Sequence, residues 1–215
     1  IYTLSLHDAL PISGVYMMIK DLCKYCPNVS SLICSVDFSP ADYNHISKAW
    51  SQSLKKIWIP RMPMVTMKLI GSKCQRLEEM EVVLHGIQTN EDSLLALLEV
   101  SSTSLTKLKL SATQCSNPLL YSISSRFPLL VELNFSESTS RCTDEGLMAL
   151  SRGCPLLNSI CLQSNPLITD MGLSAIARNG NLTSLRLCDL NNVTDKSMKV
   201  VEDFNHSLRN VALTM

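Results

Sequence analysis

Cysteine is the residue type with the most obvious chemical potential in this chain of 215 residues, which contains nine of them. Cys23 and Cys26 have the C-x-x-C spacing of a zinc site. No second C-x-x-C pair follows, and Cys26, Cys74 and Cys154 each stand three residues before a recurring apolar position. A small apolar side chain packs well beneath a tight turn between a helix and a strand. We therefore expect packing cysteines and no metal site.

The sequence offers no residue pattern that is typical of catalysis. It contains no G-x-S-x-G, no G-x-x-x-x-G-K-[ST] and no H-E-x-x-H. His45, His85 and His206 fall in different repeats and share no repeat position. Gly71-Ser72-Lys73 is interpreted as a turn rather than a phosphate-binding loop. We expect that the protein is not an enzyme and needs no cofactor.

The charge balance narrows the range of partners. Nineteen Lys and Arg residues match nineteen Asp and Glu residues, which gives a formal net charge of zero. Such a chain has no general positive field to attract nucleic acid or an anionic membrane. No uninterrupted apolar stretch approaches the roughly 20 residues of a transmembrane helix. We therefore expect a protein partner, no nucleic acid and no membrane.

The cysteines also bear on the cellular compartment. An odd number of cysteines spaced by repeat position argues against secretion, where cysteines are usually paired. Glycosylation sequons at Asn28, Asn181 and Asn205 keep an extracellular protein as the alternative. We expect a cytoplasmic or nuclear protein, and gel mobility after glycosidase treatment separates the two alternatives.

The first twelve residues are interpreted separately. Residues 2–12 read YTLSLHDALPI, which is similar to a translated short-read sequencing adapter. The alternatives are a signal peptide and a natural strand. The signal peptide is disfavoured because a positive n-region is missing and His7 and Asp8 interrupt the apolar stretch. We predict that residues 1–12 are not native and that residues 13–215 form a single repeat domain. We also expect this domain to be truncated at both ends, because a solenoid normally closes with a polar capping repeat.

The pattern L-x-x-L-x-L recurs eight times along the chain. Its first positions lie 23 to 28 residues apart, at residues 29, 54, 77, 105, 130, 157, 182 and 208. This period is typical of leucine-rich repeats. Positions four and six alternate with polar residues most clearly where Lys107 and Lys109 flank Leu108, as a strand with one buried face requires.

The second half of each repeat predicts a short helix. Thr143, Thr169 and Thr194 each precede an Asp and a helical stretch, and a Thr hydroxyl at this place can accept from an exposed backbone N–H. The Asp that follows favours the positive end of the helix dipole. Gly153 and Gly180 are placed to end two of these helices. The prediction is an α/β leucine-rich-repeat solenoid of about eight repeats, a horseshoe with a parallel β-sheet on the concave face and helices on the convex face.

The repeat sequences also permit a comparison with a known family. CPNVSSLIC, RCTDEGLMALSRGCPLL and LITDMGLSAIARNGNLTSLRLC resemble the cysteine-containing leucine-rich-repeat subfamily, best known from F-box/LRR proteins. The resemblance covers approximately residues 16–215 and is strongest from Arg141 onward. It implies a substrate-recognition region whose F-box, lying upstream, docks on a cullin ubiquitin ligase. The alternative is an adaptor or scaffold protein with no ubiquitin-ligase role, and an upstream F-box would discriminate between them.

Strand geometry predicts the binding surface. If positions one, four and six face the core, positions three and five face the concave side. Lys56, Glu79, Lys107 and Glu132 then form a lateral ladder of alternating charge, and Glu81 lies beside Lys109. The ladder is either satisfied within itself and solvated, or a charge-patterned surface that selects a partner.

Trp58 favours a surface that selects a partner, because Trp and Arg are enriched at the hot spots of protein interfaces. Val83 is expected to extend the apolar area beside it. The predicted partner-binding residues are Ile33, Lys56, Trp58, Arg61, Glu79, Glu81, Leu84, Lys107, Lys109, Glu132 and Arg186.

Overall fold

The computed structural model describes most of the chain as two compact units. The described residues are 2–6, 19–34, 39–58, 64–83, 91–111, 114–135, 139–163, 166–188 and 191–214. One unit spans Ile1–Leu105 and the other spans Thr106–Met215. Both consist of strands that alternate with helices, as the repeat pattern predicts.

The first unit contains four parallel strands and four helices in its described part. The strands β1 (Tyr2–Leu6), β2 (Val29–Cys34), β3 (Lys56–Trp58) and β4 (Glu79–Val83) pair in that order. The helices are α1 (Ile19–Tyr25), α2 (Pro40–Ala49), α3 (Met64–Lys73) and α4 (Glu91–Val100). Strand β1 lies within residues 1–12, and its pairing with β2 does not test whether that segment is native.

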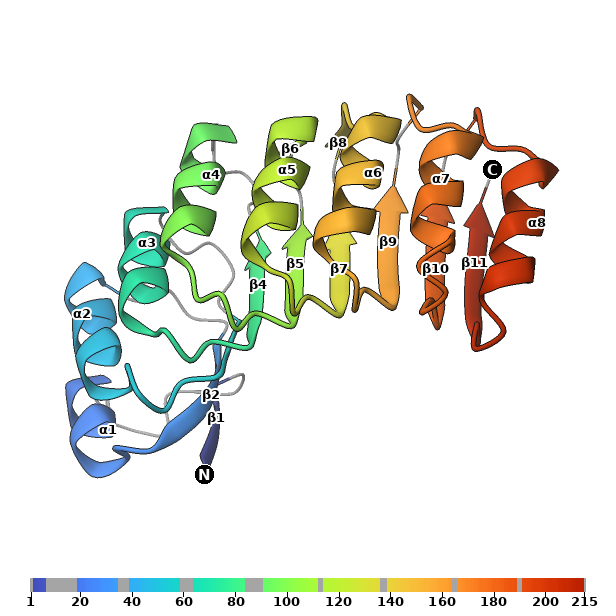
Figure 1. Cartoon of the computed structure of the whole chain (residues 1–215). Coiled ribbons are helices and arrows are strands. Elements are labelled where there is room, and N and C mark those ends of the chain that lie inside the picture. The colour runs from blue at the N-terminus through green and yellow to red at the C-terminus, as the bar shows by residue number, and fades with distance from the viewer. Residues whose placement is uncertain are drawn as a thin grey trace. The chain divides into compact units, whose positions relative to one another are not determined.

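The second unit continues the same alternation. Its main sheet has the order β5 (Lys107–Ser111), β7 (Glu132–Phe135), β9 (Ser159–Gln163), β10 (Ser184–Cys188) and β11 (Asn210–Thr214), and the pairs are parallel. The helices are α5 (Asn117–Arg126), α6 (Asp144–Gly153), α7 (Asp170–Ala177) and α8 (Asp195–Phe204). The pattern did not predict the small parallel pair β6 (Gln114–Cys115) and β8 (Thr139–Ser140). In each unit the helices lie on one side of the sheet (Figure 1).

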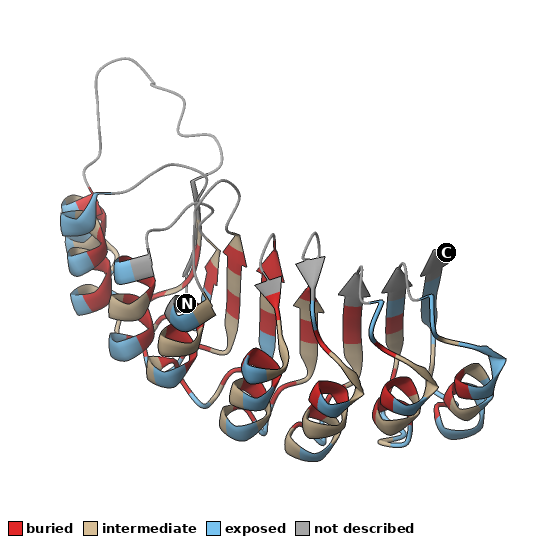
Figure 2. Cartoon of the chain, turned by 90° about the horizontal axis from the view of Figure 1, so that it is seen from above, coloured by how far each residue is buried: buried red, intermediate tan, exposed pale blue. Residues whose placement is uncertain are grey.

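The apolar positions of the repeat form the core between strands and helices (Figure 2). Position four is almost fully buried in seven of the eight repeats, at Leu32, Ile57, Met80, Leu108, Leu133, Ile160 and Leu185. In the eighth repeat Val211 is 49% exposed, which corrects the expectation that it is core. The reason is local: among the described residues β11 pairs with β10 alone, so one side of this repeat is uncovered.

The residue that follows a helix, before the turn into the next strand, connects consecutive repeats. Cys74 and Cys154 are fully buried there, as expected for packing residues, while Cys26 is partly exposed. Trp50 is the residue that caps α2 at its C-terminus, four residues before Leu54, and donates from Nε1 to the Cys26 carbonyl at 2.7 Å. Asn205 donates from Nδ2 to the Ala177 carbonyl at 2.9 Å. These bonds satisfy buried carbonyl groups of the preceding repeat.

The predicted Thr caps are present, with one difference. Thr169 and Thr194 accept from the backbone N–H two residues ahead, at 3.2 and 3.3 Å. Thr143 is also an N-cap residue but makes no such bond; its hydroxyl accepts from Asn117 Nδ2 at 2.8 Å. The Thr143 hydroxyl therefore bonds to the neighbouring repeat and not, as the sequence had predicted, to its own helix.

The acidic residues after these caps have a second role. Asp144 accepts from the backbone N–H of Thr169 at 2.8 Å and from its hydroxyl at 2.6 Å. Asp170 makes the same two contacts with Thr194 and also accepts from Ser197 Oγ at 2.7 Å. Each carboxylate thus fastens its helix to the next repeat.

Gly153 and Gly180 lie at helix ends for different reasons. Gly180 follows α7 with a φ of 70°, the left-handed region that glycine adopts without strain. Gly153 is the last residue of α6, and a Cβ atom there would lie 2.1 Å from the Ser124 carbonyl oxygen. Close packing of α6 on α5 therefore requires this glycine.

Candidate partner-binding face

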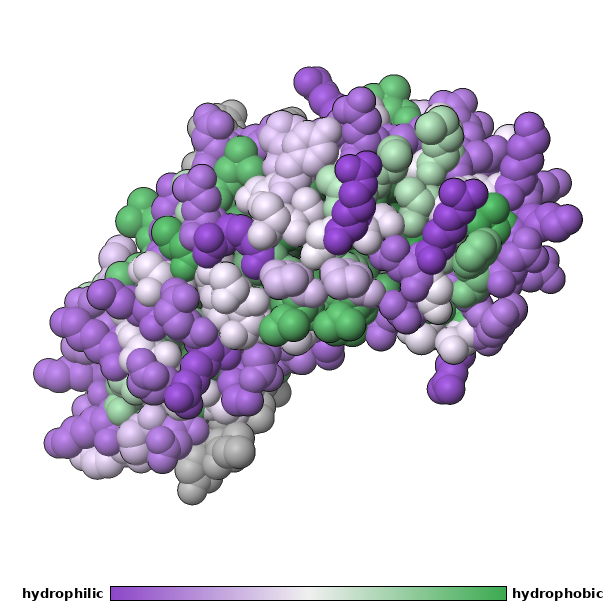
Figure 3. Space-filling view, viewed as in Figure 1, coloured by the Kyte–Doolittle hydropathy of each residue, from purple (hydrophilic) through white to green (hydrophobic). Residues whose placement is uncertain are grey.

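The face of each sheet opposite its helices, here called the open face, carries positions three and five. On β4 the burial alternates between partly exposed Glu79, Glu81 and Val83 and buried Met80 and Val82. The same alternation on β3 and β7 places the predicted side chains on the open face. The opposite side, which carries the helices, is largely hydrophilic with small apolar areas (Figure 3).

Lys56 and Glu79 form the first step of the predicted charge ladder. They are register partners on β3 and β4, and Lys56 Nζ lies 2.8 Å from Glu79 Oε2. Their side chains are 46% and 28% exposed. A pair this accessible to solvent contributes about 0–1 kcal/mol to stability.

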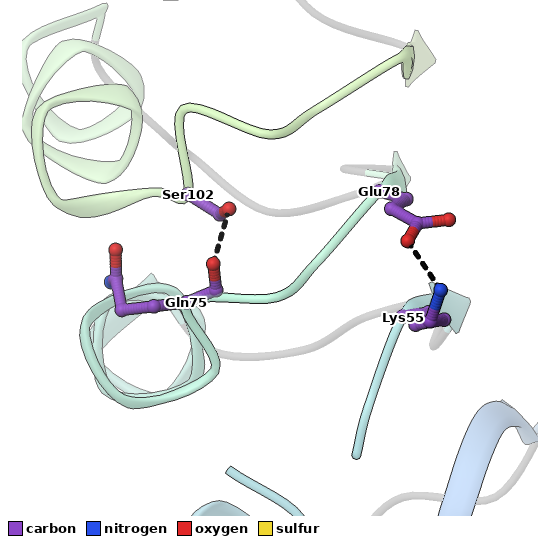
Figure 4. Close-up of polar contacts among 4 residues, drawn as sticks. All are labelled: Lys55, Gln75, Glu78 and Ser102. Carbon is purple, nitrogen blue, oxygen red and sulfur yellow. Dashed lines mark hydrogen bonds and ion pairs between the residues drawn. The ribbon is translucent and has the colours of Figure 1, made fainter. Parts of the chain in front are cut away.

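A second ion pair lies beside the first, at position two of the same repeats. Lys55 Nζ lies 2.6 Å from Glu78 Oε1 (Figure 4). Sequence reasoning missed this pair because it considered positions three and five alone. The sequence signal that could have revealed this pair is the opposite charge at position two of two consecutive repeats. In the same view Ser102 Oγ donates to the Gln75 carbonyl at 2.7 Å, which fastens two further turns.

Trp58 lies on the open face of the first unit between Ile33 and Glu81. All three occupy position five, and the strand register places Trp58 directly beside each of the other two. Each is partly exposed. The indole therefore has an apolar neighbour on one side and a carboxylate on the other.

The second unit carries the remaining predicted residues. Lys107 is the register partner of Glu132, and Lys109 is the register partner of Asn134. Asn134 Oδ1 is shielded from solvent and accepts no hydrogen bond from the described residues. Arg186 is exposed on β10, where its register partners are Cys161 and Ala212.

The contacts predicted between the two units stay predictions. Glu79 and Glu81 belong to the first unit, whereas Lys107 and Lys109 belong to the second. Arg61 and Leu84 lie outside the described residues.

Two open-face positions differ from expectation. Cys161 at position five is only 5% exposed, and Ser31 at position three is only 8% exposed. Each is a small side chain with a longer one beside it on the next strand, Arg186 and Lys56 respectively. A short side chain between longer ones is shielded from water, although it points to the open face.

Three cysteines, Cys23, Cys74 and Cys154, show little character of metal ligands or nucleophiles. Burial raises the pKa of the Cys74 thiol to about 12 and that of Cys154 to about 11. Burial also raises the pKa of Cys23 to about 11, and Asp42 and Cys26 add to the effect. A raised pKa depletes the thiolate, which is the form that binds metals and attacks electrophiles. Within the described ranges, no group of three or more His, Cys, Asp or Glu side chains could hold a metal ion.

The helices are also short. Among the described residues, none of the helices has the length and apolar character needed to cross a bilayer.

The recurring strand, turn and helix, with one buried apolar pattern per repeat, define both units as leucine-rich-repeat solenoids. No protein-family model matches the chain, and no curated protein matches its sequence.

Solved structures do match the fold. The tropomodulin C-terminal domain from Caenorhabditis elegans matches with a TM-score of 0.53 and 16% identity, over 68% of this chain and 93% of that chain. A chain of the Rad7 and Elc1 complex in yeast matches with a TM-score of 0.52 and 14% identity, over 90% of this chain and 65% of that chain. The leucine-rich repeat-containing protein LegL7 from Legionella pneumophila has a TM-score of 0.45 and 11% identity, over 99% of this chain and 89% of that chain. At these identities the likeness concerns the fold alone.

Proposed function

We propose that the open face binds another protein and that the chain acts by binding rather than by catalysis. The observation that carries this proposal is the surface around Trp58. A partly exposed indole lies in register with Ile33, near the ion pair between Lys56 on β3 and Glu79 on β4. A second ion pair, Lys55 with Glu78, lies just before these two strands. Trp at the centre of a surface is typical of binding hot spots, and surrounding polar residues exclude water from such a centre.

The charges around Trp58 restrict the partner. A partner segment that crosses β3 and β4 beside Trp58 meets the ammonium group of Lys56 and then the carboxylate of Glu79. It fits best when it presents a carboxylate over β3 and a basic side chain over β4, beside an apolar residue that packs on the indole. Complementary charges of this kind set specificity and association rate more than affinity.

The wider role that we propose is substrate recognition for a cullin ubiquitin ligase in the cytoplasm or nucleus. Its support is the resemblance of the repeats to the cysteine-containing subfamily, together with the packing cysteines Cys74 and Cys154 at the expected position. The second candidate is an adaptor or scaffold with no ligase role. An open binding face serves both, and only the presence of an F-box in the natural protein separates them.

The binding face is tested by affinity capture with the wild-type chain and two matched variants. Trp58→Ala removes the indole from the open face. Tyr121→Ala removes a more exposed aromatic ring from helix α5, where Tyr121 is 41% exposed. We expect partners to be lost with Trp58→Ala and retained with Tyr121→Ala, while both variants unfold cooperatively. Equal retention by both variants would contradict the proposed face.

The ligase role is tested separately with the full-length natural protein. Co-precipitation of a cullin adaptor, and accumulation of the captured partner when the protein is depleted, would support substrate recognition. Capture of the same partner with no cullin adaptor and no change in partner abundance would favour the adaptor function. This result would contradict the ligase role but not the proposal that the open face binds a partner.

A further inference from the structure

Cys115 and Cys142 bring two sulfur atoms together inside the second unit. Their Sγ atoms lie 2.7 Å apart, and the residues are only 1% and 0% exposed. They belong to consecutive repeats, with Cys115 at the end of β6 and Cys142 two residues after β8. A disulfide bond measures about 2.05 Å, so a small movement of the side chains brings the sulfurs to bonding distance.

The backbone holds the two cysteines in this arrangement. Strands β6 and β8 pair in parallel, and Arg141 N donates to the Cys115 carbonyl at 2.8 Å. Just beyond the sulfurs, Asn117 exchanges two hydrogen bonds with Thr143, at 2.8 and 3.0 Å. Cys115 is the register partner of Ser140, and Cys142 follows two residues later, in the turn that leads to the Thr143 cap.

Packing alone does not require cysteine at this repeat position. Cys115 and Cys142 each precede the N-cap residue of a helix, and Ile168 and Val193 take the same place in the next two repeats. Ile168 is fully buried there. An aliphatic side chain therefore fills the position, and the two adjacent thiols add a chemical property that Ile and Val lack.

We propose that Cys115 and Cys142 form a reversible disulfide that joins two consecutive repeats. The oxidant is a small disulfide such as oxidised glutathione. The thiolate of one cysteine attacks a sulfur of the small disulfide and releases one small thiol. The thiolate of the second cysteine then attacks the protein sulfur of the mixed disulfide and releases the second small thiol. Two protein thiols and one small disulfide thus become one protein disulfide and two small thiols.

The bond would stabilise the second unit by restricting its unfolded chain, since it closes a loop between residues 115 and 142. Reaction in the native state is slow, because buried sulfurs meet the oxidant only when the surrounding segments open. This property is independent of partner binding on the open face.

The test is to unfold the chain, refold it in a glutathione buffer rich in the oxidised form, and block the remaining thiols by alkylation. Peptide mapping should find one peptide pair linked through Cys115 and Cys142, and the link should disappear with dithiothreitol. The melting midpoint should rise by roughly 5–10 °C on oxidation.

Two variants control this experiment. Cys115→Val, which copies the residue type of the later repeats, should fold but lose both the link and the shift in melting midpoint. Cys154→Ala removes a buried cysteine at another repeat position and should keep both. Complete alkylation of Cys115 and Cys142 after oxidative refolding, or links to other cysteines instead, would overturn the proposal.

Discussion

Lys56 Nζ contacts Glu79 Oε2 at 2.8 Å across the neighbouring parallel strands β3 and β4. The contact lies on the open face, and Lys56 is two residues before Trp58 on the same strand. Charges on a sheet can fix the strand register or recognise a partner, and variants of this ion pair distinguish these two roles.

The first prediction concerns this ion pair. Lys56→Glu should lower the free energy of unfolding by roughly 0.5–1 kcal/mol, because it places two like charges on adjacent strands. The double variant Lys56→Glu with Glu79→Lys should recover stability, measured by urea unfolding. If the partner recognises the charge order, the double variant still binds weakly. Full recovery of binding together with stability would show that the ladder serves strand register alone.

The second prediction compares the two tryptophans. Trp50 is fully buried and donates to the Cys26 carbonyl, so Trp50→Ala should destabilise the first unit by roughly 3–5 kcal/mol. Trp58 is partly exposed on the open face, and Trp58→Ala should cost roughly 1 kcal/mol or less. Chemical denaturation of both variants measures the difference. A loss of cooperative unfolding in Trp58→Ala would place its ring in the core instead.

The third prediction concerns Gly153. In an exposed helix, replacing Gly by Ala stabilises by about 1 kcal/mol. Gly153→Ala should instead destabilise, because the new Cβ atom would meet the Ser124 carbonyl oxygen at 2.1 Å and push α6 away from α5. Thermal unfolding measures the sign, and Ser125→Ala, at an exposed position of α5, is the control. A higher melting midpoint for Gly153→Ala would contradict the packing described for these helices.

The fourth prediction concerns pH. Hydrogen bonds from the hydroxyl and backbone N–H of Thr194 and from Ser197 lower the pKa of Asp170 from 3.8 to about 2. The unfolded state therefore binds the proton more readily than the folded state. The stabilisation from this carboxylate is fully present above pH 4 and is lost as the pH falls through about 2.

Asp170→Asn removes this titration. Melting midpoints of wild type and variant should differ most above pH 4 and converge towards pH 2. A difference that stays constant over this range would show that the contacts with Thr194 do not depend on the charge of Asp170.

Periodicity made much of the fold predictable. Eight copies of one apolar pattern with a period near 26 residues can be buried together only by stacking, and the eight predicted strands all occur. The buried positions of Cys74 and Cys154 were predictable for the same reason, because each lies three residues before the pattern. Single residues such as Cys161 and Val211 were less predictable, since their exposure depends on the length or presence of neighbours in other repeats.

The sequence by itself determined the repeat architecture and the residues that face the core, since a strand period of two and a repeat period near 26 leave few alternatives for burying so many apolar side chains. Contacts between repeats were decided by tertiary structure. Asp144 and Asp170 read as helix-start residues in sequence, yet their carboxylates bind the caps of the next repeat. Likewise, Cys115 and Cys142 meet because two turns that are 27 residues apart in the sequence lie on one another. Such contacts depend on how one repeat packs on the next, and the sequence pattern of a single repeat does not contain this information.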